Sequence, residues 1–399
     1  MDICLRQEKF HRVIFKKYRV KRMVKEEQTI RNLLCYYQEL ACKSYPTEAK
    51  MNHILGYLYD AKFKVNLTSF GSYSVIEYSL VAADPTFIED KDYTIDALEK
   101  YFNAFVEPVM RGQQAVKGLF ARAYEIYESD LLSREENMQA MAFKKAISTY
   151  FAGTNRDFNT FGSLEKLENI TPLELYQYYL KTLDEETISF LSGRVEEKLE
   201  EQKITLTPKR NYHFKERGTP EAFCHLPLAS EQCYVEIIYE LGVYADDKLY
   251  YPMMFLNYIL GGQASSLLFK IVREKYGLCY SINTIYLGAT GILILSAILH
   301  PKDYAKALSA MEEVFQLLEA GDFSIEEARS FYKAANLMGK DYIETAIQNY
   351  LSDTYFLDSP KASLELEELD KVTKADVLEA FHKMRQSFIF VYGGESIER

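Results

Sequence analysis

The chain of 399 residues is 48% hydrophobic and 26% charged, which is typical of a folded globular protein and excludes a disordered or collagen-like chain. Its 47 basic and 58 acidic side chains give a formal net charge of −11, so it carries no basic footprint for a nucleic-acid backbone. The longest apolar run, 291–299, is too short to span a membrane, and the basic residues 1–25 lack the apolar core of a secretion signal.

In the first half of the chain, apolar residues recur with the periods of strands and of amphipathic helices. Thr94 is expected to cap one of these helices, because a threonine side chain can accept a hydrogen bond from the first turn. The predicted strands cover 9–20 and 74–81, and the predicted helices cover 29–41, 94–106 and 133–150.

The second half shows the same mixture of helices and strands. Gly261-Gly262 should end one helix and Gly277 the next, because glycine commonly follows a helix C-terminus, and Ser265 or Ser266 should cap the second helix. The predicted elements are a strand over 233–239, helices over 247–260 and 265–275, and a hairpin of strands over 280–286 and 291–298. The pattern predicts an α+β fold.

Two similar segments, 167–175 and 369–377, indicate an internal duplication. Each contains a threonine, Thr171 or Thr373, followed at the third position by an acidic residue, which predicts a capping-box helix start. Each predicted helix then leads into an apolar strand that ends in glycine. The threonines lie 202 residues apart (373 − 171), which favours two homologous halves over a chance match of two helix–strand units.

A boundary between the halves is predicted from composition. The charged run 196–203 gives way to a polar segment that contains Pro208, Gly218 and Pro220. We therefore expect an N-terminal half over 1–200, a linker over 201–220 and a C-terminal half over 221–399.

The six cysteines contain no Cys-x-x-Cys pair. They are interpreted as reduced thiols of a cytoplasmic protein. Cys35 and Cys42 lie seven residues apart, so soft-metal binding is one interpretation, although buried structural thiols are favoured by the general behaviour of cysteine.

The most specific pattern lies in the second half. It reads Leu-Gly-Gly-Gln-Ala-Ser-Ser-Leu-Leu-Phe over 260–269 and Val-Arg-Glu-Lys-Tyr-Gly-Leu-Cys-Tyr-Ser over 272–281. This pattern resembles the second-half signature of the inverted-zinc-motif metallopeptidases, the family of pitrilysin, insulin-degrading enzyme and mitochondrial processing peptidase. The resemblance implies the fold of that family, an α+β fold of two homologous halves that each contain antiparallel sheets flanked by helices.

Active members of that family carry His-x-x-Glu-His on a first-half helix, and with a downstream glutamate the two histidines hold zinc. The matching helix, 29–41, contains no histidine, and no two of the six histidines lie four residues apart. His213 begins a His-x-x-Glu sequence, but Arg217 stands where the second ligand should be. Glu125 could mimic the downstream glutamate, yet it has no partner ligands. No metal, cofactor or catalytic residue is therefore predicted.

The resemblance does retain two substrate-contacting residues, Arg273 and Tyr280. They match an arginine and a tyrosine, seven residues apart, that contact the peptide and the oxyanion in active relatives. The resemblance thus implies that Arg273 and Tyr280 bind substrate. A structural interpretation stays open, because Arg273 could complement a helix C-terminus and Tyr280 could begin a strand.

These features predict a catalytically inactive subunit that pairs with a zinc-containing peptidase homologue to form a chamber that degrades or processes peptides. A heterodimer is expected, although a homodimer remains open, and neither nucleic acid nor a membrane is expected as a partner. One alternative is a structural or scaffold protein with the peptidase fold. The other is a stand-alone metalloendopeptidase with an unrecognised site.

Overall fold

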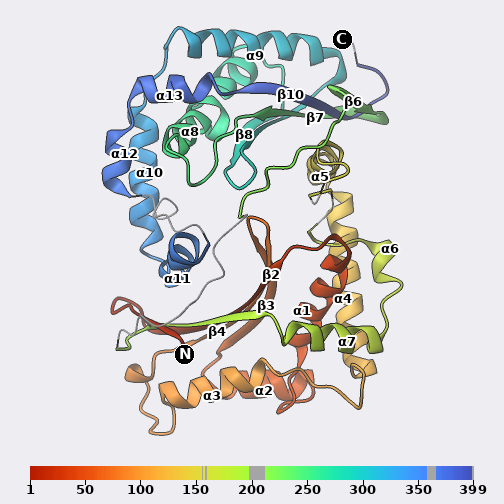
Figure 1. The fold of residues 1–399 in the computed structure, drawn as a ribbon, viewed down its shortest axis with the longest axis vertical. Helices are drawn as coiled ribbons and strands as arrows, with labels where there is room; N and C mark the ends of the chain where they lie inside the picture. Colours follow the sequence, from red (N-terminus) through yellow and green to blue (C-terminus); the bar gives the residue numbers. More distant parts are fainter. Residues whose placement is uncertain (155, 158–159, 197–211, 357–364, 398–399) are drawn as a thin grey trace. The chain divides into compact units, whose positions relative to one another are not determined.

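The structure, a computed structural model, describes residues 1–154, 156–157, 160–196, 212–356 and 365–397. The chain forms two compact units, each built on one five-stranded sheet (Figure 1). The first comprises Met1–Ser133, Phe158–Arg210 and Lys340–Leu351, and the second comprises Arg134–Asp157, Asn211–Gly339 and Ser352–Arg399. Among the described residues, no helix has the length and hydropathy needed to cross a membrane.

The two sheets share one topology. Their strand orders are β1-β5-β2-β4-β3 and β6-β10-β7-β9-β8, and in each the short first strand pairs parallel with the last strand while the other pairs are antiparallel. The predicted α+β fold of two similar halves is confirmed, with one parallel edge pair in each sheet. The strands are β1 (Ile3–Arg6), β2 (Arg12–Arg22), β3 (Lys62–Phe70), β4 (Tyr73–Ala83), β5 (Glu186–Gly193), β6 (Phe223–Leu226), β7 (Leu228–Glu240), β8 (Ser281–Leu287), β9 (Ile292–Leu299) and β10 (Arg385–Gly394).

Helices cover the sheets of both units. Those of the first unit are η1 (Lys25–Glu27), α1 (Gln28–Leu40), α2 (Glu48–Tyr57), η2 (Pro85–Phe87), α3 (Ile95–Phe105), α4 (Lys117–Glu136), α6 (Leu164–Leu167), α7 (Pro172–Thr182) and α11 (Thr345–Tyr350). Those of the second unit are α5 (Met138–Tyr150), α8 (Tyr250–Asn257), η3 (Tyr258–Gly262), η4 (Phe269–Lys275), η5 (Pro301–Asp303), α9 (Tyr304–Glu319), α10 (Glu326–Gly339), η6 (Leu351–Phe356), α12 (Leu366–Lys371) and α13 (Lys374–Phe381).

The predicted duplication is visible in helices α7 and α13. Thr171 Oγ1 accepts a hydrogen bond from the Glu174 N–H (3.3 Å), and the Glu174 carboxylate accepts one from the Thr171 N–H (2.8 Å). Thr373 and Asp376 form the same reciprocal pair, at 3.2 and 2.8 Å. Both predicted capping boxes are therefore confirmed, and each helix precedes the strand at the same place in its sheet, β5 or β10.

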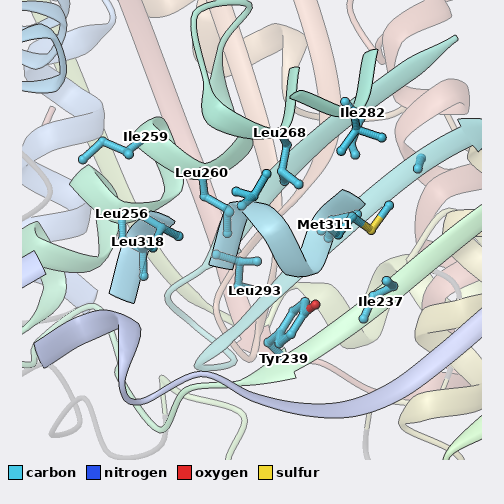
Figure 2. Packing of buried hydrophobic residues seen from close by; sticks show 14 of the residues in the cluster. Ile237, Tyr239, Leu256, Ile259, Leu260, Leu268, Ile282, Leu293, Met311 and Leu318 are labelled. Atoms are coloured by element: carbon cyan, nitrogen blue, oxygen red, sulfur yellow. The ribbon is translucent and has the colours of Figure 1, made fainter. Parts of the chain in front are cut away.

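The core of the second unit lies between one face of its sheet and helices α8, α9 and α13. Alternate residues of β7, such as Ile237 and Tyr239, point to this face and belong to one buried cluster with Leu256, Leu260 and Met311 (Figure 2). The pleat of the strand sends successive side chains to opposite faces, so Glu236 and Ile238, which are also buried, point to the other face of the sheet.

The opposite face of each sheet is covered by a helix from the other half of the sequence. Helix α5 lies beside β7 of the second sheet (Figure 1), and Tyr150 of this helix packs with Ile238 and Phe388. On the first sheet, Tyr350 of α11 meets Phe190 edge to face, with ring centroids 5.6 Å apart. The two units therefore differ from the predicted halves, 1–200 and 221–399, in these two exchanged segments.

Residues 201–211 of the predicted linker, 201–220, lie outside the described residues. Its described part packs within the second unit. The Phe214 N–H donates to the Ala289 carbonyl (2.8 Å), and the Arg217 guanidinium donates to the Thr290 carbonyl (2.5 Å). These contacts fasten 212–217 to the turn between β8 and β9.

The prediction of one helix over 133–150 is wrong. Helix α4 ends at Glu136, and α5 begins at Met138 after Asn137, whose side chain accepts a hydrogen bond from the Ala140 N–H (3.0 Å). An asparagine at this position competes with helix continuation by capping a new helix.

The predicted Thr94 cap on α3 is confirmed, because Thr94 Oγ1 accepts a hydrogen bond from the Ala97 N–H.

Candidate functional site

Helix α1 is the position at which the resemblance places a zinc motif. Its C-terminal part lies along the edge strand β3 of the first sheet. The Glu39 carboxylate accepts a hydrogen bond from the Val65 N–H (3.2 Å) and pairs with the Lys64 ammonium (2.5 Å). Glu39 thus satisfies a backbone donor that an edge strand would otherwise leave open.

Among the sets of α1 side chains at i, i+3 and i+4, the spacing of His-x-x-Glu-His, one contains both a thiol and a carboxylate, namely Cys35, Gln38 and Glu39. The Cys35 thiol is buried, which raises its pKa to about 12. Buried Gln38 accepts a hydrogen bond from the Tyr78 hydroxyl (2.9 Å) and donates one to the Val106 carbonyl (3.3 Å). At this spacing a protonated thiol and the paired Glu39 carboxylate stand where the two imidazole ligands should be, and a bonded amide stands where the general base should be, so the set does not reproduce a catalytic zinc site.

The described part of the chain contains no group of three histidine, cysteine or carboxylate side chains that could hold a metal ion. Glu125 is exposed and pairs with Arg122 on its own helix (3.7 Å). His213 Nε2 contacts Asp246 in the second unit (2.8 Å). Cys42 is buried in the hydrophobic core of the first unit, as Cys35 is. The residues present do not fit the family's zinc ion.

We therefore expect the purified chain to bind less than stoichiometric zinc and to show no chelator-sensitive peptide cleavage by itself. The measurement is elemental analysis after dialysis against zinc, together with a fluorogenic peptide assay with and without chelator. One zinc ion per chain with cleavage that the chelator abolishes would contradict the assignment of an inactive domain.

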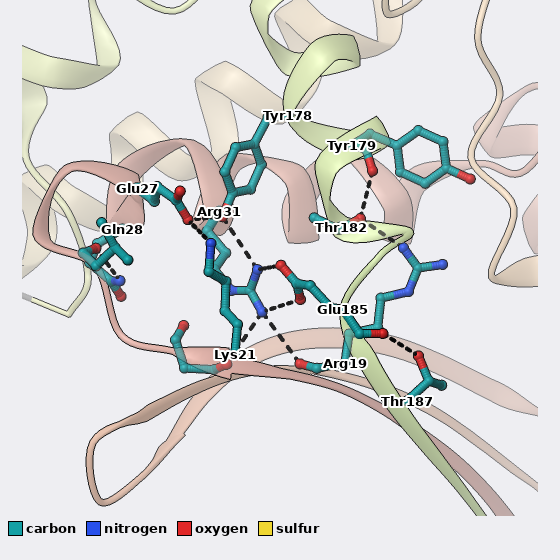
Figure 3. A network of polar contacts seen from close by, with 12 residues as sticks. Arg19, Lys21, Glu27, Gln28, Arg31, Tyr178, Tyr179, Thr182, Glu185 and Thr187 are labelled. Carbon is teal, nitrogen blue, oxygen red and sulfur yellow. Dashed lines mark hydrogen bonds and ion pairs between the residues drawn. The ribbon is translucent and has the colours of Figure 1, made fainter. Parts of the chain in front are cut away.

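Arg31, in the N-terminal half of α1, forms a buried ion pair with Glu185 (Figure 3). The Arg31 side chain is fully buried, and its two terminal nitrogens contact the two oxygens of Glu185, at 2.5 and 2.7 Å. The guanidinium also donates to the Tyr178 hydroxyl and to the carbonyls of Arg19 and Ser74, each at 3.3 Å. Burial opposes the charge of Arg31, but the contacts with Glu185 and Tyr178 outweigh it and raise the pKa.

Glu27 extends this network on the preceding turn. Its carboxylate accepts hydrogen bonds from Lys21 (2.5 Å) and Tyr178 (2.8 Å) (Figure 3). Burial alone would raise the pKa of Glu27, but these hydrogen bonds and the nearby cations lower it. Glu27 and Arg31 are thus hydrogen-bonded to residues of β2 and α7, and these bonds link the start of α1 to both elements. Sequence reasoning missed this network, although Arg31 stands in phase with the buried residues Leu34 and Gln38.

Arg273 and Tyr280, the two predicted substrate-binding residues, lie in the second unit. Arg273 is exposed on η4, where its guanidinium stands 4.6 Å from the centroid of the Phe269 ring. Tyr280 is 56% exposed and directly precedes β8. Its N–H donates a hydrogen bond to the Ile298 carbonyl of β9 (2.8 Å). Within the described residues, neither the Arg273 guanidinium nor the Tyr280 hydroxyl has an ion-pair or hydrogen-bond partner.

The segment between these residues is fixed by its own contacts. Of the two serines predicted to cap this helix, Ser266 directly precedes the helical residues 267–275, and its Oγ accepts a hydrogen bond from the Phe269 N–H (3.4 Å). Gly277, with φ of +62°, ends the turn as predicted. Lys275 and the Tyr276 hydroxyl both contact Glu313 on α9, at 2.7 Å each. Arg273 and Tyr280 are therefore carried on an anchored backbone.

The glycine pair of the signature has a packing role. Gly261 and Gly262 are the last two residues of η3, so the helical segment ends at this pair, but they lie within the helix and not after it, and neither has the positive φ of a glycine cap. A Cβ atom on Gly261 would lie 2.9 Å from the Thr284 backbone nitrogen. Only glycine allows η3 to approach β8 so closely.

Comparisons with known proteins agree with this arrangement. Residues 173–331 match the family model described as Peptidase M16 inactive domain. The chain is 21% identical over 388 residues to the probable inactive metalloprotease YmfF of Bacillus subtilis strain 168, covering 91% of this chain and 88% of that protein.

Two solved structures are similar over almost the whole chain. A conserved protein from Enterococcus faecalis V583 has a TM-score of 0.87 at 20% identity, covering 99% of this chain and 96% of that one. A peptidase M16 inactive domain from Pseudomonas fluorescens has a TM-score of 0.74 at 15% identity, with the same coverage of 99% and 96%. At these identities the likeness establishes the fold.

Proposed function

Because the chain is a member of the M16 peptidase family, the inverted-zinc-motif metallopeptidases, and lacks their zinc motif, we propose that it is the inactive subunit of a two-chain peptidase. It pairs with a zinc-containing homologue, and together they form a chamber that degrades or processes peptides. We place this pair in the cytoplasm, a location supported by the interpretation of the six cysteines, which contain no Cys-x-x-Cys pair, as reduced thiols.

One contrast between two sites carries this proposal. Arg31 and Gln38 of α1 are bonded to groups on neighbouring elements, whereas the charged group of Arg273 and the hydroxyl of Tyr280 are exposed and, within the described residues, have no polar partner. A fixed cation and a phenol donor can stabilise negative charge on a peptide bound beside them. The chain therefore offers substrate-binding groups without the means to activate water.

We expect Arg273→Ala and Tyr280→Phe each to lower kcat/KM of partner-supported peptide cleavage by about 10- to 100-fold, because each removes a donor aimed at the substrate. The measurement is cleavage of a peptide by the reconstituted pair. Lys270→Ala is the matched control, since Lys270 is exposed on the neighbouring turn, and it should leave cleavage within about twofold of the unsubstituted pair. Unchanged cleavage in both test variants would remove the substrate-binding role.

The pairing itself is tested by affinity purification of the tagged chain from its native cells, with mass spectrometry of the co-purifying chains. Recovery of a similar-sized protein with His-x-x-Glu-His on a first-half helix, in stoichiometric amount, is the expected result. Recovery of this chain alone, or of a large assembly without such a protein, would contradict the pairing and favour the scaffold role.

A further inference from the structure

Helix α7 has apolar side chains on two opposite faces. Leu175, Tyr178 and Thr182 are buried against the first unit. The outer face carries four further apolar side chains at helical spacings of three, four and three residues, namely Leu173, Tyr176, Leu180 and Leu183. The leucines are 46%, 42% and 50% exposed, and a surface helix normally presents polar residues on this side.

The duplicated helix α13 shows that the fold does not require this outer stripe. Counted from the capping threonines Thr171 and Thr373, Leu173 corresponds to Ala375 and Leu180 corresponds to His382. All four residues are exposed. At these two positions both helices meet solvent, yet only α7 places leucines there; the stripe residue Tyr176 corresponds to another apolar residue, Leu378. The fold therefore does not require Leu173 and Leu180 to be leucine.

The exposed charges along the segment that carries the stripe are mostly acidic. Within 168–186, exposed Glu168, Glu174, Asp184 and Glu186 are opposed by one exposed lysine, Lys181. A second copy docked by twofold symmetry would bring these carboxylates towards each other, and anionic lipid headgroups would be repelled in the same way. An apolar surface flanked by lysine or arginine complements the stripe and its rim.

We propose that the outer face of α7 is a docking surface for an amphipathic helix of another protein, whose leucine-type stripe is flanked by basic side chains. Leu173, Leu180 and Leu183 provide the apolar contact, and Asp184 and its acidic neighbours orient the bound helix. This surface lies outside the features on which the proposed pairing rests, and its test does not depend on a zinc-containing partner.

The test uses the purified full-length chain and three labelled synthetic helical peptides. The first has leucines along one face with lysines on both flanks, the second has the same leucines with glutamates, and the third keeps the lysines but replaces the leucines by serines. We expect fluorescence anisotropy to detect binding of the first peptide only. The double variant Leu173→Gln/Leu180→Gln should weaken this binding by about tenfold or more.

The control is Tyr57→Gln, which alters an exposed aromatic residue on α2 in the same unit and should leave binding unchanged. Thermal unfolding of each variant establishes that the comparison is made on folded protein. Absence of binding of the first peptide, equal binding of the glutamate peptide, or binding that persists in the double variant would overturn the proposal. So would self-association, or binding to anionic phosphatidylglycerol vesicles, that the double variant abolishes, because the occupant would then be a second copy or a membrane.

Discussion

Arg31→Met is expected to lower the free energy of unfolding by about 3 to 5 kcal/mol, because it leaves the Glu185 carboxylate buried without its cation. The substitution also removes the donors to the carbonyls of Arg19 and Ser74. Urea unfolding followed by circular dichroism measures the loss, with similar m-values indicating that the denatured state is unchanged.

Two variants separate the ion pair from general disturbance of the helix. Arg31→Met combined with Glu185→Leu removes both charges and should recover part of the loss, since a paired replacement by apolar groups is often tolerated. Arg122→Met breaks the exposed pair with Glu125 and should cost no more than about 1 kcal/mol. A cost that small for Arg31→Met would mean that the buried network does not hold α1 in place.

The second large effect is a pH dependence that comes from Glu236. This residue lies on β7 and is 2% exposed, and its carboxyl group contacts the Ser296 hydroxyl on β9. Within the described residues no cation pairs with it. Burial raises its pKa to about 8, and the Ser296 hydrogen bond offsets only part of this effect.

Because the folded pKa lies above the ordinary value of 4.5, the folded state holds a proton that the unfolded state releases between these two pH values. The stabilising contribution is complete below pH 4.5 and is lost as the pH rises through about 8. We expect the free energy of unfolding to fall by on the order of 5 kcal/mol across this window from Glu236 alone. Chemical denaturation at a series of pH values measures the fall.

Glu236→Gln should remove most of this pH dependence, because the amide keeps a polar group of the same shape but cannot ionise. At pH 8 the variant should therefore be more stable than the unsubstituted chain. Glu312→Gln, an exposed change on α9, serves as the control and should leave the pH profile as it was. The same slope in Glu236→Gln as in the unsubstituted chain would show that other groups cause the pH dependence.

Several elements could be predicted from the sequence because their signals are local. Thr94, Thr171 and Thr373 cap helices through hydrogen bonds that reach only three residues along the chain. The β8–β9 hairpin also follows from adjacent apolar strands. By contrast, the split between α4 and α5 depended on one asparagine, Asn137, whose cap competes with a continuous apolar helix pattern.

The candidate site also combines features that the sequence reveals with features that only the folded structure reveals. The absence of paired histidines could be read directly, because zinc ligands on a helix need a fixed short spacing. The contacts of Arg31 with Glu185 could not, because the two residues are 154 positions apart and meet only when α1 packs beside the start of β5. Glu236 gave a weaker signal, as an acidic residue inside an apolar strand, but its burial depends on the helix and strands around it.

The sequence by itself therefore determined the duplicated α+β halves, the helix caps, the missing zinc motif and the positions of Arg273 and Tyr280 in a family signature. These features are set by residue type and short spacing. Only the tertiary structure decided that α5 and α11 are exchanged between the units, that Arg31 is buried with Glu185, and that Gly261 meets Thr284. Each of these depends on which distant segments share a sheet face, because burial and contact free energy belong to the assembled packing and not to any single segment.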